Sequence, residues 1–230
     1  MAEILVVAAH PDDEVLGCGG TMARHVENGD TVHVVIMAEG VTSRLGRSRD
    51  AAAVADLHAA THAANAVLGV SDVTHEGLPD NRLDGVERLE IIQRIETHIA
   101  RCHPKAVYTH HAGDVNVDHQ VVHHAVVTAC RPQTGYPVET LLFFEIPSST
   151  EWQTPGSALP FLPNWFVDIS STLERKLEAL DAYRSEMRPW PHPRSIEAIS
   201  HLARWRGASC SMACAEAFML GRHLLSKHVS

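Results

Sequence analysis

The chain has 230 residues, of which 45% are hydrophobic and 20% are charged, and this composition supports one sizeable core and excludes intrinsic disorder. Its 19 basic and 28 acidic residues give a net charge of −9 without any basic run, so nucleic acid is not expected as a partner. No apolar run approaches the roughly 20 residues of a membrane span, and the start MAEILVVAAH lacks the basic region of a signal peptide, so we expect a cytoplasmic protein with a single domain over residues 1–230.

The first half of the chain alternates between predicted strands and predicted helices. Continuous apolar or β-branched runs predict strands at residues 4–9, 31–38 and 106–109. Helical patterns between them predict helices at residues 15–28, 49–68 and 83–101. Such alternation indicates a parallel α/β sheet with right-handed crossovers.

The second half is less regular. Strands are predicted at residues 141–146 and 165–169, and helices at residues 118–131, 171–184, 195–206 and 213–225. Four prolines in residues 147–163 predict a long loop, of the kind that often forms a functional lid. Three further prolines in residues 189–193 separate two of the predicted helices.

The strongest motif is HPDDE at residues 10–14, directly after the first predicted strand. Open α/β sheets bind ligands at this edge, where a dinucleotide-binding protein would carry a glycine-rich turn. An imidazole and two carboxylates indicate a cation instead, and they suit Zn²⁺. The alternative is that Asp12 and Asp13 cap the following helix. Capping explains one aspartate but neither His10 nor Pro11.

A second polar cluster, HHAGDVNVDH at residues 110–119, follows the strand predicted at residues 106–109. Because parallel strands end at the same edge of a sheet, we expect both clusters to lie close together. Asp118 and His119 then open a helix. His123 and His124, one turn into that helix, are interpreted as helix-face residues rather than ligands.

Two segments, AHPDDEVLGCGGTMARH at residues 9–25 and GDVNVDHQVVHHAV at residues 113–126, resemble the LmbE-like, or PIG-L, family of zinc-dependent N-acetyl-sugar deacetylases, and AEAF at residues 215–218 fits as well. The resemblance implies a Rossmann-like three-layer α/β/α sandwich with a mostly parallel sheet. It also implies that His10, Asp13 and His119 bind Zn²⁺ or another divalent transition metal, and that Asp12 is the general base. Three protein ligands leave a fourth position open for water, as in catalytic zinc sites, and a free carboxylate can accept the proton of that water.

The sequence departs from the family at Asn116, where many members have a histidine that acts with Asp118 as a proton relay. Asparagine cannot transfer a proton, so we expect Asn116 to orient the substrate and Asp118 to orient a metal ligand. Candidates for the missing acid are His110, His111 and His192.

Many family members also carry Arg-x-x-Glu where this chain has residues 57–60, so those substrate contacts are absent. Arg44 is a candidate replacement, although a solvated loop charge explains it equally well. The turn at residues 78–82 resembles the substrate-binding turn of the family, with Asp80 expected to accept hydrogen bonds from sugar hydroxyls, and a plain turn is the alternative. Indole rings that could cover a sugar or simply pack lie in the proline-rich segments, at Trp152 and Trp190.

The sequence therefore predicts a metal-dependent hydrolase that removes an N-acetyl group from an N-acetylglucosamine-like sugar or sugar conjugate, with a small N-acetylated molecule as its partner. One alternative is a deacylase of a non-sugar amide, such as an antibiotic or thiol-cofactor intermediate. Another is a metal-binding protein without turnover, against which the free carboxylate of Asp12 argues. The sequence leaves the oligomeric state open, a homo-oligomer included.

Overall fold

The computed structural model describes residues 1–40, 51–133 and 138–225. Within these residues the strands are β1 (Glu3–Ala8), β2 (Thr31–Ala38), β3 (Asp72–Leu78), β4 (Ala106–His110), β5 (Thr140–Phe144), β6 (Trp165–Asp168) and β7 (Ala215–His223). The helices are α1 (Asp13–Glu27), α2 (Ala51–Leu68), α3 (Arg88–Cys102), α4 (Val117–Ala129), α5 (Leu173–Ala182) and α6 (Ile196–Ala208), with 3₁₀ turns η1 (Leu83–Gly85) and η2 (Thr150–Trp152). None of the helices in this part of the chain has the length and apolarity that crossing a bilayer requires.

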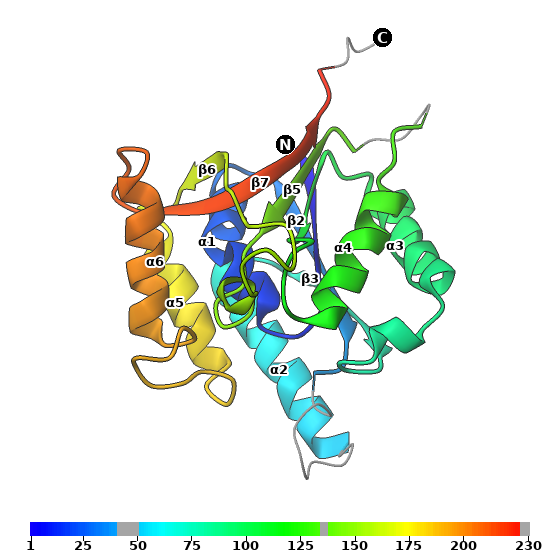
Figure 1. Cartoon of the computed structure of the whole chain (residues 1–230), viewed down its shortest axis with the longest axis horizontal. Coiled ribbons are helices and arrows are strands. Elements are labelled where there is room, and N and C mark those ends of the chain that lie inside the picture. The colour runs from blue at the N-terminus through cyan, green and yellow to red at the C-terminus, as the bar shows by residue number, and fades with distance from the viewer. Residues whose placement is uncertain (41–50, 134–137, 226–230) are drawn as a thin grey trace.

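The strands form one sheet in the order β3-β2-β1-β4-β5-β7-β6. Figure 1 shows this sheet with helices on both sides of it. Strands β1 to β5 run parallel to one another, and β7 pairs antiparallel with both β5 and β6. The strand order reverses at β1, because β2 and β3 lie on one side of it while β4 and β5 lie on the other. A crevice between β1 and β4 at the carboxyl edge is where such sheets bind ligands.

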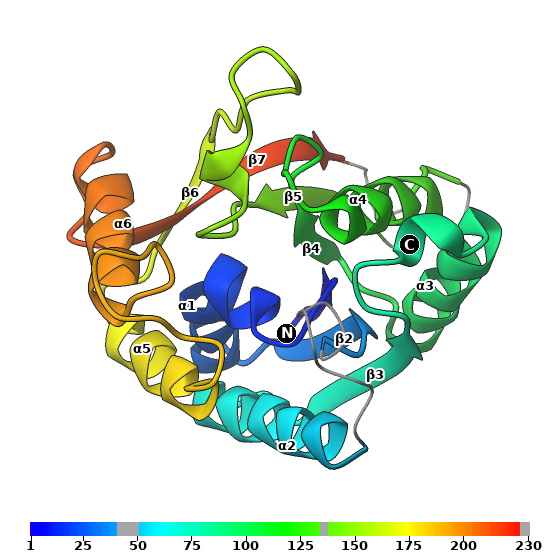
Figure 2. The same ribbon diagram turned by 60° about the horizontal axis from the view of Figure 1, so that its bottom comes forward.

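Successive side chains of β1 serve two separate cores. Ile4, Val6 and Ala8 pack with α1, α2, α5 and α6 on one face of the sheet. Leu5 and Val7 pack with α3 and α4 on the other face. Figures 1 and 2 show the two groups of helices on opposite sides of the sheet. The expected three-layer α/β/α sandwich with a mostly parallel sheet is confirmed.

Most of the predicted elements are present with shifted ends, but the helix predicted at residues 213–225 is wrong. This segment contains the antiparallel strand β7. Its alanines, leucines and methionines favour a helix when they are judged alone. Residues 215–218 are nevertheless buried between β5 and β6, and pairing with these strands outweighs the local preference.

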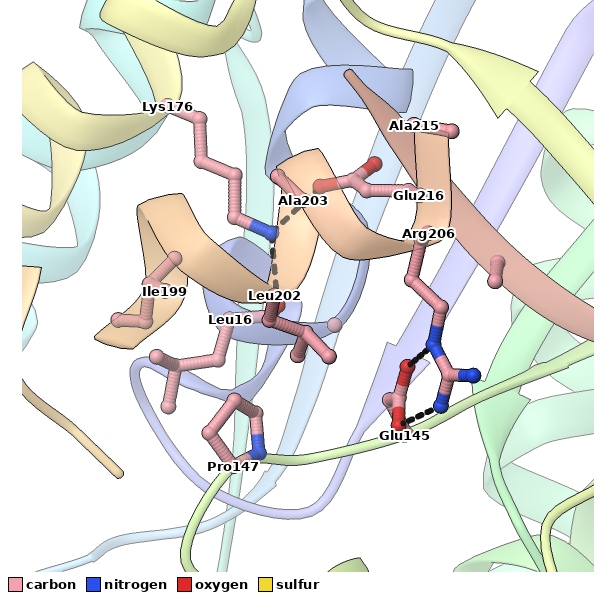
Figure 3. A pocket seen from close by; sticks show the side chains of 12 residues that line it. Leu16, Glu145, Pro147, Lys176, Ile199, Leu202, Ala203, Arg206, Ala215 and Glu216 are labelled. Atoms are coloured by element: carbon pink, nitrogen blue, oxygen red, sulfur yellow. Dashed lines mark hydrogen bonds and ion pairs between the residues drawn. The ribbon is translucent and has the colours of Figure 1, made fainter. Parts of the chain in front are cut away.

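Glu216 ties β7 to the helix that follows the HPDDE motif. Helix α1 is interrupted at Cys18, whose φ of −149° is not helical. The Glu216 carboxylate accepts the backbone N–H groups of Gly20 and Thr21, at 3.0 and 2.7 Å, at the start of the second part of this helix. Lys176 of α5 donates to the same carboxylate at 2.6 Å (Figure 3). The AEAF segment thus supports α1, which carries Asp13 at its start.

Candidate functional site

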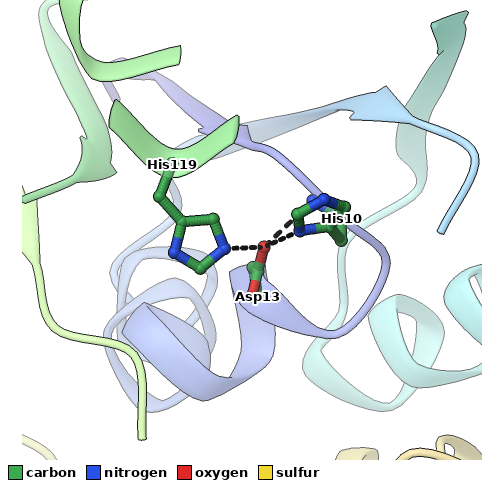
Figure 4. Close-up of side chains that lie close together, drawn as sticks. All are labelled: His10, Asp13 and His119. Carbon is green, nitrogen blue, oxygen red and sulfur yellow. Dashed lines mark hydrogen bonds and ion pairs between the residues drawn. The ribbon is translucent and has the colours of Figure 1, made fainter. Parts of the chain in front are cut away.

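His10, Asp13 and His119 converge at the carboxyl edge of β1 and β4 (Figure 4). His10 follows β1, Asp13 begins α1, and His119 lies in the first turn of α4. Asp13 Oδ2 lies 3.2 Å from His10 Nδ1 and 3.2 Å from His119 Nε2. Residues separated by more than 100 positions are therefore brought into one cluster, as the strand alternation predicted.

Polar atoms of this cluster are buried without a well-formed hydrogen bond. Asp13 Oδ1 and His119 Nε2 are both inaccessible to solvent and make no hydrogen bond, although His119 Nε2 lies 3.2 Å from Asp13 Oδ2 and Arg194 Nη2 lies 3.9 Å from Asp13 Oδ1. Ligand atoms of the three side chains lie within 4.8 Å of one another. Unpartnered polar atoms in a protein interior call for a bound ion or water. Two imidazoles and a carboxylate are the donor set of a catalytic zinc site, so these residues fit a divalent metal ion.

Asp118 lies behind His10 and orients its ring. His10 Nε2 donates to Asp118 Oδ2 at 3.0 Å, which leaves Nδ1 facing Asp13. Asp118 also accepts the backbone N–H groups of Asn81 at 2.7 Å and Leu83 at 2.9 Å. A carboxylate that bonds the far nitrogen of a histidine sets the ring orientation of that metal ligand.

Asp114 stands in the same relation to His119, a role that was not predicted from the sequence. His119 Nδ1 lies 3.1 Å from Asp114 Oδ1. Asp114 accepts hydrogen bonds from the hydroxyls of Ser149 and Thr150, the latter at 2.7 Å. The feature of the sequence that could have indicated this role is the position of Asp114 inside the second polar cluster, four residues before Asp118. The hydroxyl partners on the loop after β5 gave no signal.

The carboxylates of the cluster favour the protonated forms of the two histidines, whose ring nitrogens would bind a metal ion. Burial lowers the pKa of His10, but Asp118 and Asp13 outweigh it and raise the pKa to about 10. Burial also lowers the pKa of His119, and Asp13 and Asp114 raise it to about 9. Burial raises the pKa of Asp13, but His119 and His10 bring it well below its usual range. A metal ion bound here would displace the protons of the two histidines.

Asp12 is not part of this metal-ligand set, and its side chain does not cap α1. Asp12 thus occupies the N-cap position of α1 without the side-chain hydrogen bond that capping would provide. Asp12 Oδ2 accepts a hydrogen bond from Arg194 Nη1 at 2.7 Å. The side chain is buried, and burial raises the pKa of Asp12 well above its usual range, although Arg194 opposes the shift. Arg194 was missed from the sequence, because nothing in its local pattern relates it to a residue 182 positions away.

The backbone of Asp12 is in the left-handed region, with φ of 99°. Its N–H donates to Glu14 Oε2 at 3.1 Å. Glu14 is fully buried, and its other oxygen accepts from Tyr183 Oη at 2.7 Å and Asn65 Nδ2 at 3.0 Å. Burial raises the pKa of Glu14 to about 7. The last residue of the HPDDE motif thus secures the unusual backbone of Asp12.

Two of the predicted substrate-binding residues, Asp80 and Asn116, lie beside this cluster. Asp80 is buried, and its Oδ1 lies 3.4 Å from His10 Nε2. Asn116 caps α4, since its side-chain oxygen accepts the backbone N–H of Asp118 at 2.8 Å. Substrate contacts of Asp80 and Asn116 stay predictions. Arg44 lies outside the described residues.

The three candidate acids differ in their accessibility. His110 is fully buried behind His119, with the two rings stacked at 4.0 Å, and burial holds its pKa well below its usual range. His111 is also buried, and its Nε2 donates to the carbonyl of Leu159 at 2.8 Å. His192 is partly exposed, and its ring edge contacts Trp152. Of the three, His192 has the ring that solvent can reach.

Comparisons with known proteins agree on the fold. The chain is similar to the conserved protein TT1542 of Thermus thermophilus, with 27% identity and a TM-score of 0.77 over 100% of this chain and 99% of that one. It is also similar to GalB of Pseudomonas putida KT2440, a 4-carboxy-2-hydroxymuconate hydratase, with 22% identity, a TM-score of 0.79 and full coverage of both chains. The likeness to GalB shows the fold alone.

Sequence comparisons identify the family. YaiS of Escherichia coli K12, described as an uncharacterized deacetylase, is 29% identical over 188 residues, covering 79% of this chain and 90% of YaiS. The model of the PIG-L family, described as GlcNAc-PI de-N-acetylase, matches residues 5–130. That range contains both polar clusters and all three residues of the converging set. The chain therefore belongs to the PIG-L family.

Proposed function

We propose that this protein is a zinc-dependent hydrolase that removes the N-acetyl group from an N-acetylglucosamine-like sugar or sugar conjugate. The convergence of His10, Asp13 and His119, with buried polar atoms that make no hydrogen bond, carries the proposal, together with the carboxylate of Asp12, which is not in this candidate ligand set. The description of the family as a GlcNAc-PI de-N-acetylase supports amide hydrolysis and a sugar substrate.

The proposed reaction uses one carboxylate for both proton transfers. His10, Asp13 and His119 would hold the zinc ion, which would supply Lewis acidity to the amide carbonyl and lower the pKa of water. Asp12 accepts a proton from the water as its oxygen bonds to the carbonyl carbon. Asp12 then returns that proton to the nitrogen as the C–N bond breaks, releasing acetate and a free amine. Asn116 cannot take over the second transfer because its amide N–H protons are not acidic.

The surrounding residues divide into supports and substrate contacts. We assign Asp118 and Asp114 to orienting the two histidine ligands, in agreement with their contacts to the far ring nitrogens. We assign Asp80, Asn116 and Arg44 to the substrate, as the sequence motifs suggested. A metal-binding protein without turnover would not need, beside its ligands, a buried carboxylate such as that of Asp12, whose backbone is strained.

An acetate-release screen tests the proposal. N-acetylated sugars, nucleotide sugars and N-acetylated thiol glycosides are offered with and without a chelator, and non-sugar N-acetyl amides serve as the comparison class. We expect acetate from at least one sugar-containing class, abolished by the chelator and restored by Zn²⁺. Absence of acetate from every substrate would reject the proposal, since a hydratase of the same fold releases none.

Two variants separate the base from the ligands. Asp12→Asn keeps the shape of the side chain, so we expect turnover to fall by roughly 10²-fold or more with zinc content unchanged. His119→Ala should lose zinc and activity together. Loss of zinc in Asp12→Asn would make Asp12 a ligand, and unchanged zinc affinity in His119→Ala would show that the ligand set is wrong.

A further inference from the structure

Arg194 makes the two oxygens of Asp12 inequivalent. Its Nη1 donates to Asp12 Oδ2 at 2.7 Å, and its Nε donates to Ser148 Oγ at 2.8 Å. Asp12 Oδ1 accepts no hydrogen bond from any residue that the structure describes. The Asp12 side chain is 2% exposed and that of Arg194 is 21% exposed. One oxygen of the proposed base is thus held by a guanidinium, and the other is left for a proton.

The segment between α5 and α6 holds Arg194 in place. The Arg188 N–H donates to the Arg194 carbonyl at 3.2 Å, and the Arg194 N–H donates to His192 Nδ1 at 3.1 Å. Ser195, the next residue, caps α6 through its hydroxyl. Three prolines within residues 189–193 restrict the backbone further. Because hydrogen bonds fix the backbone at Arg194 and at the next residue, the guanidinium group extends toward Asp12 from a well-defined backbone position.

A general base works only when its oxygen reaches the proton at hydrogen-bond distance. Asp12 has a backbone conformation that L-residues rarely adopt, and its short side chain has no other side-chain partner among the described residues. We propose that Arg194 is a positioning residue for Asp12, which holds Oδ2 so that Oδ1 is directed to the attacking water. This inference rests on the proposed function, in which Asp12 is the base.

Arg206 provides a matched control. Its Nε and Nη2 bond to the two oxygens of Glu145 at 2.8 and 2.7 Å (Figure 3), and its side chain is also 21% exposed. Neither Arg206 nor Glu145 contacts Asp12, Asp13 or the two histidines of the cluster. Arg206→Gln therefore removes an equally exposed arginine from a carboxylate elsewhere in the molecule, although the side chain of Glu145, at 18% exposed, is less buried than that of Asp12.

The test measures kcat and KM for acetate release, together with bound zinc and the unfolding midpoint. We expect Arg194→Gln to lower kcat by roughly 10²-fold, as for a misplaced reacting group, with KM and zinc content unchanged. Arg206→Gln should leave kcat unchanged. In Arg194→Ala, guanidinium ion added below its denaturing concentration should restore part of kcat, and Asp12→Asn/Arg194→Gln should be no slower than Asp12→Asn alone.

Several outcomes would overturn the inference. Equal kcat in Arg194→Gln and Arg206→Gln would leave Arg194 a structural residue, and a change confined to KM would make it a substrate-binding residue. Independent losses in the double variant would also refute a role through Asp12. If Arg194→Gln does not fold, Arg194→Lys and Ser148→Ala provide the same comparison. The proposed function itself fails on different results, namely no acetate from the unaltered enzyme or full activity in Asp12→Asn.

Discussion

Asp118→Asn should destabilise the protein through a single backbone amide. Asp118 Oδ2 accepts from His10 Nε2 at 3.0 Å and from the Asn81 N–H at 2.7 Å, while Oδ1 accepts the Leu83 N–H at 2.9 Å. Asparagine accepts at only one of these two positions. The orientation that keeps most bonds places its NH₂ group against the Leu83 N–H. A buried N–H that loses its acceptor in this way costs about 1–3 kcal/mol.

Asp114→Asn is the matched comparison, because it also removes a carboxylate charge from behind a histidine ligand. The amide nitrogen can replace Asp114 Oδ2, whose partner is the Thr150 hydroxyl at 2.7 Å. A hydroxyl can turn and accept a hydrogen bond, which a backbone N–H cannot do. The oxygen that remains can still face His119 and the Asn116 N–H. The Thr150 hydroxyl also accepts the Ile146 N–H at 2.8 Å, so in this variant only the rotatable hydroxyl proton of Thr150 loses its acceptor, and no backbone N–H is stranded.

Urea unfolding of the chelator-treated variants measures the difference. We expect Asp118→Asn to be less stable than Asp114→Asn by about 1–3 kcal/mol, the cost of the stranded amide. Both variants should bind zinc roughly 10–100-fold more weakly than the unaltered protein, as for other carboxylates behind metal-bound histidines. Equal unfolding free energies for the two variants would refute the reasoning.

Three further predictions concern protons and buried charge. The pKa values of His10 and His119 are about 10 and about 9 without metal, so zinc binding at pH 7 should release about two protons. Calorimetry of zinc binding in buffers of different ionisation enthalpy measures this release, and a result of no released protons would contradict the prediction. Glu216→Gln leaves Lys176 buried without its counter-charge, so the free energy of unfolding measured in urea should fall by about 3–5 kcal/mol. A variant as stable as the unaltered protein would show that this ion pair does not stabilise the fold. Burial lowers the pKa of His123 from 6.5 to about 4, so the unfolded chain binds a proton that the folded protein excludes. Stability should therefore fall as the pH drops from 6.5 toward 4, less steeply in His123→Gln, and parallel pH profiles would disprove this contribution.

The sequence by itself indicated the parallel part of the sheet and the meeting of the two polar clusters, since both follow from local patterns, whereas the choice of His10, Asp13 and His119 within those clusters followed from the resemblance to the PIG-L family. Apolar runs mark buried parallel strands, and the residues after each run must emerge at one edge of the sheet. His10, Asp13 and His119 could therefore be expected to meet, and the structure brings their ligand atoms within 4.8 Å. The order of residues along the chain was sufficient here because strand direction alone decides which ends are neighbours.

Only the tertiary structure decided which distant groups complete the site. Arg194 reaches Asp12 from an irregular segment 182 residues away, and Asp114 takes its hydroxyl partners from the loop after β5. Segments without periodicity carry no local signal of what they will contact. Strand β7 was predicted as a helix for a related reason: its alanine-rich composition favours a helix locally, whereas pairing with β5 and β6 is a long-range interaction that outweighs the local preference.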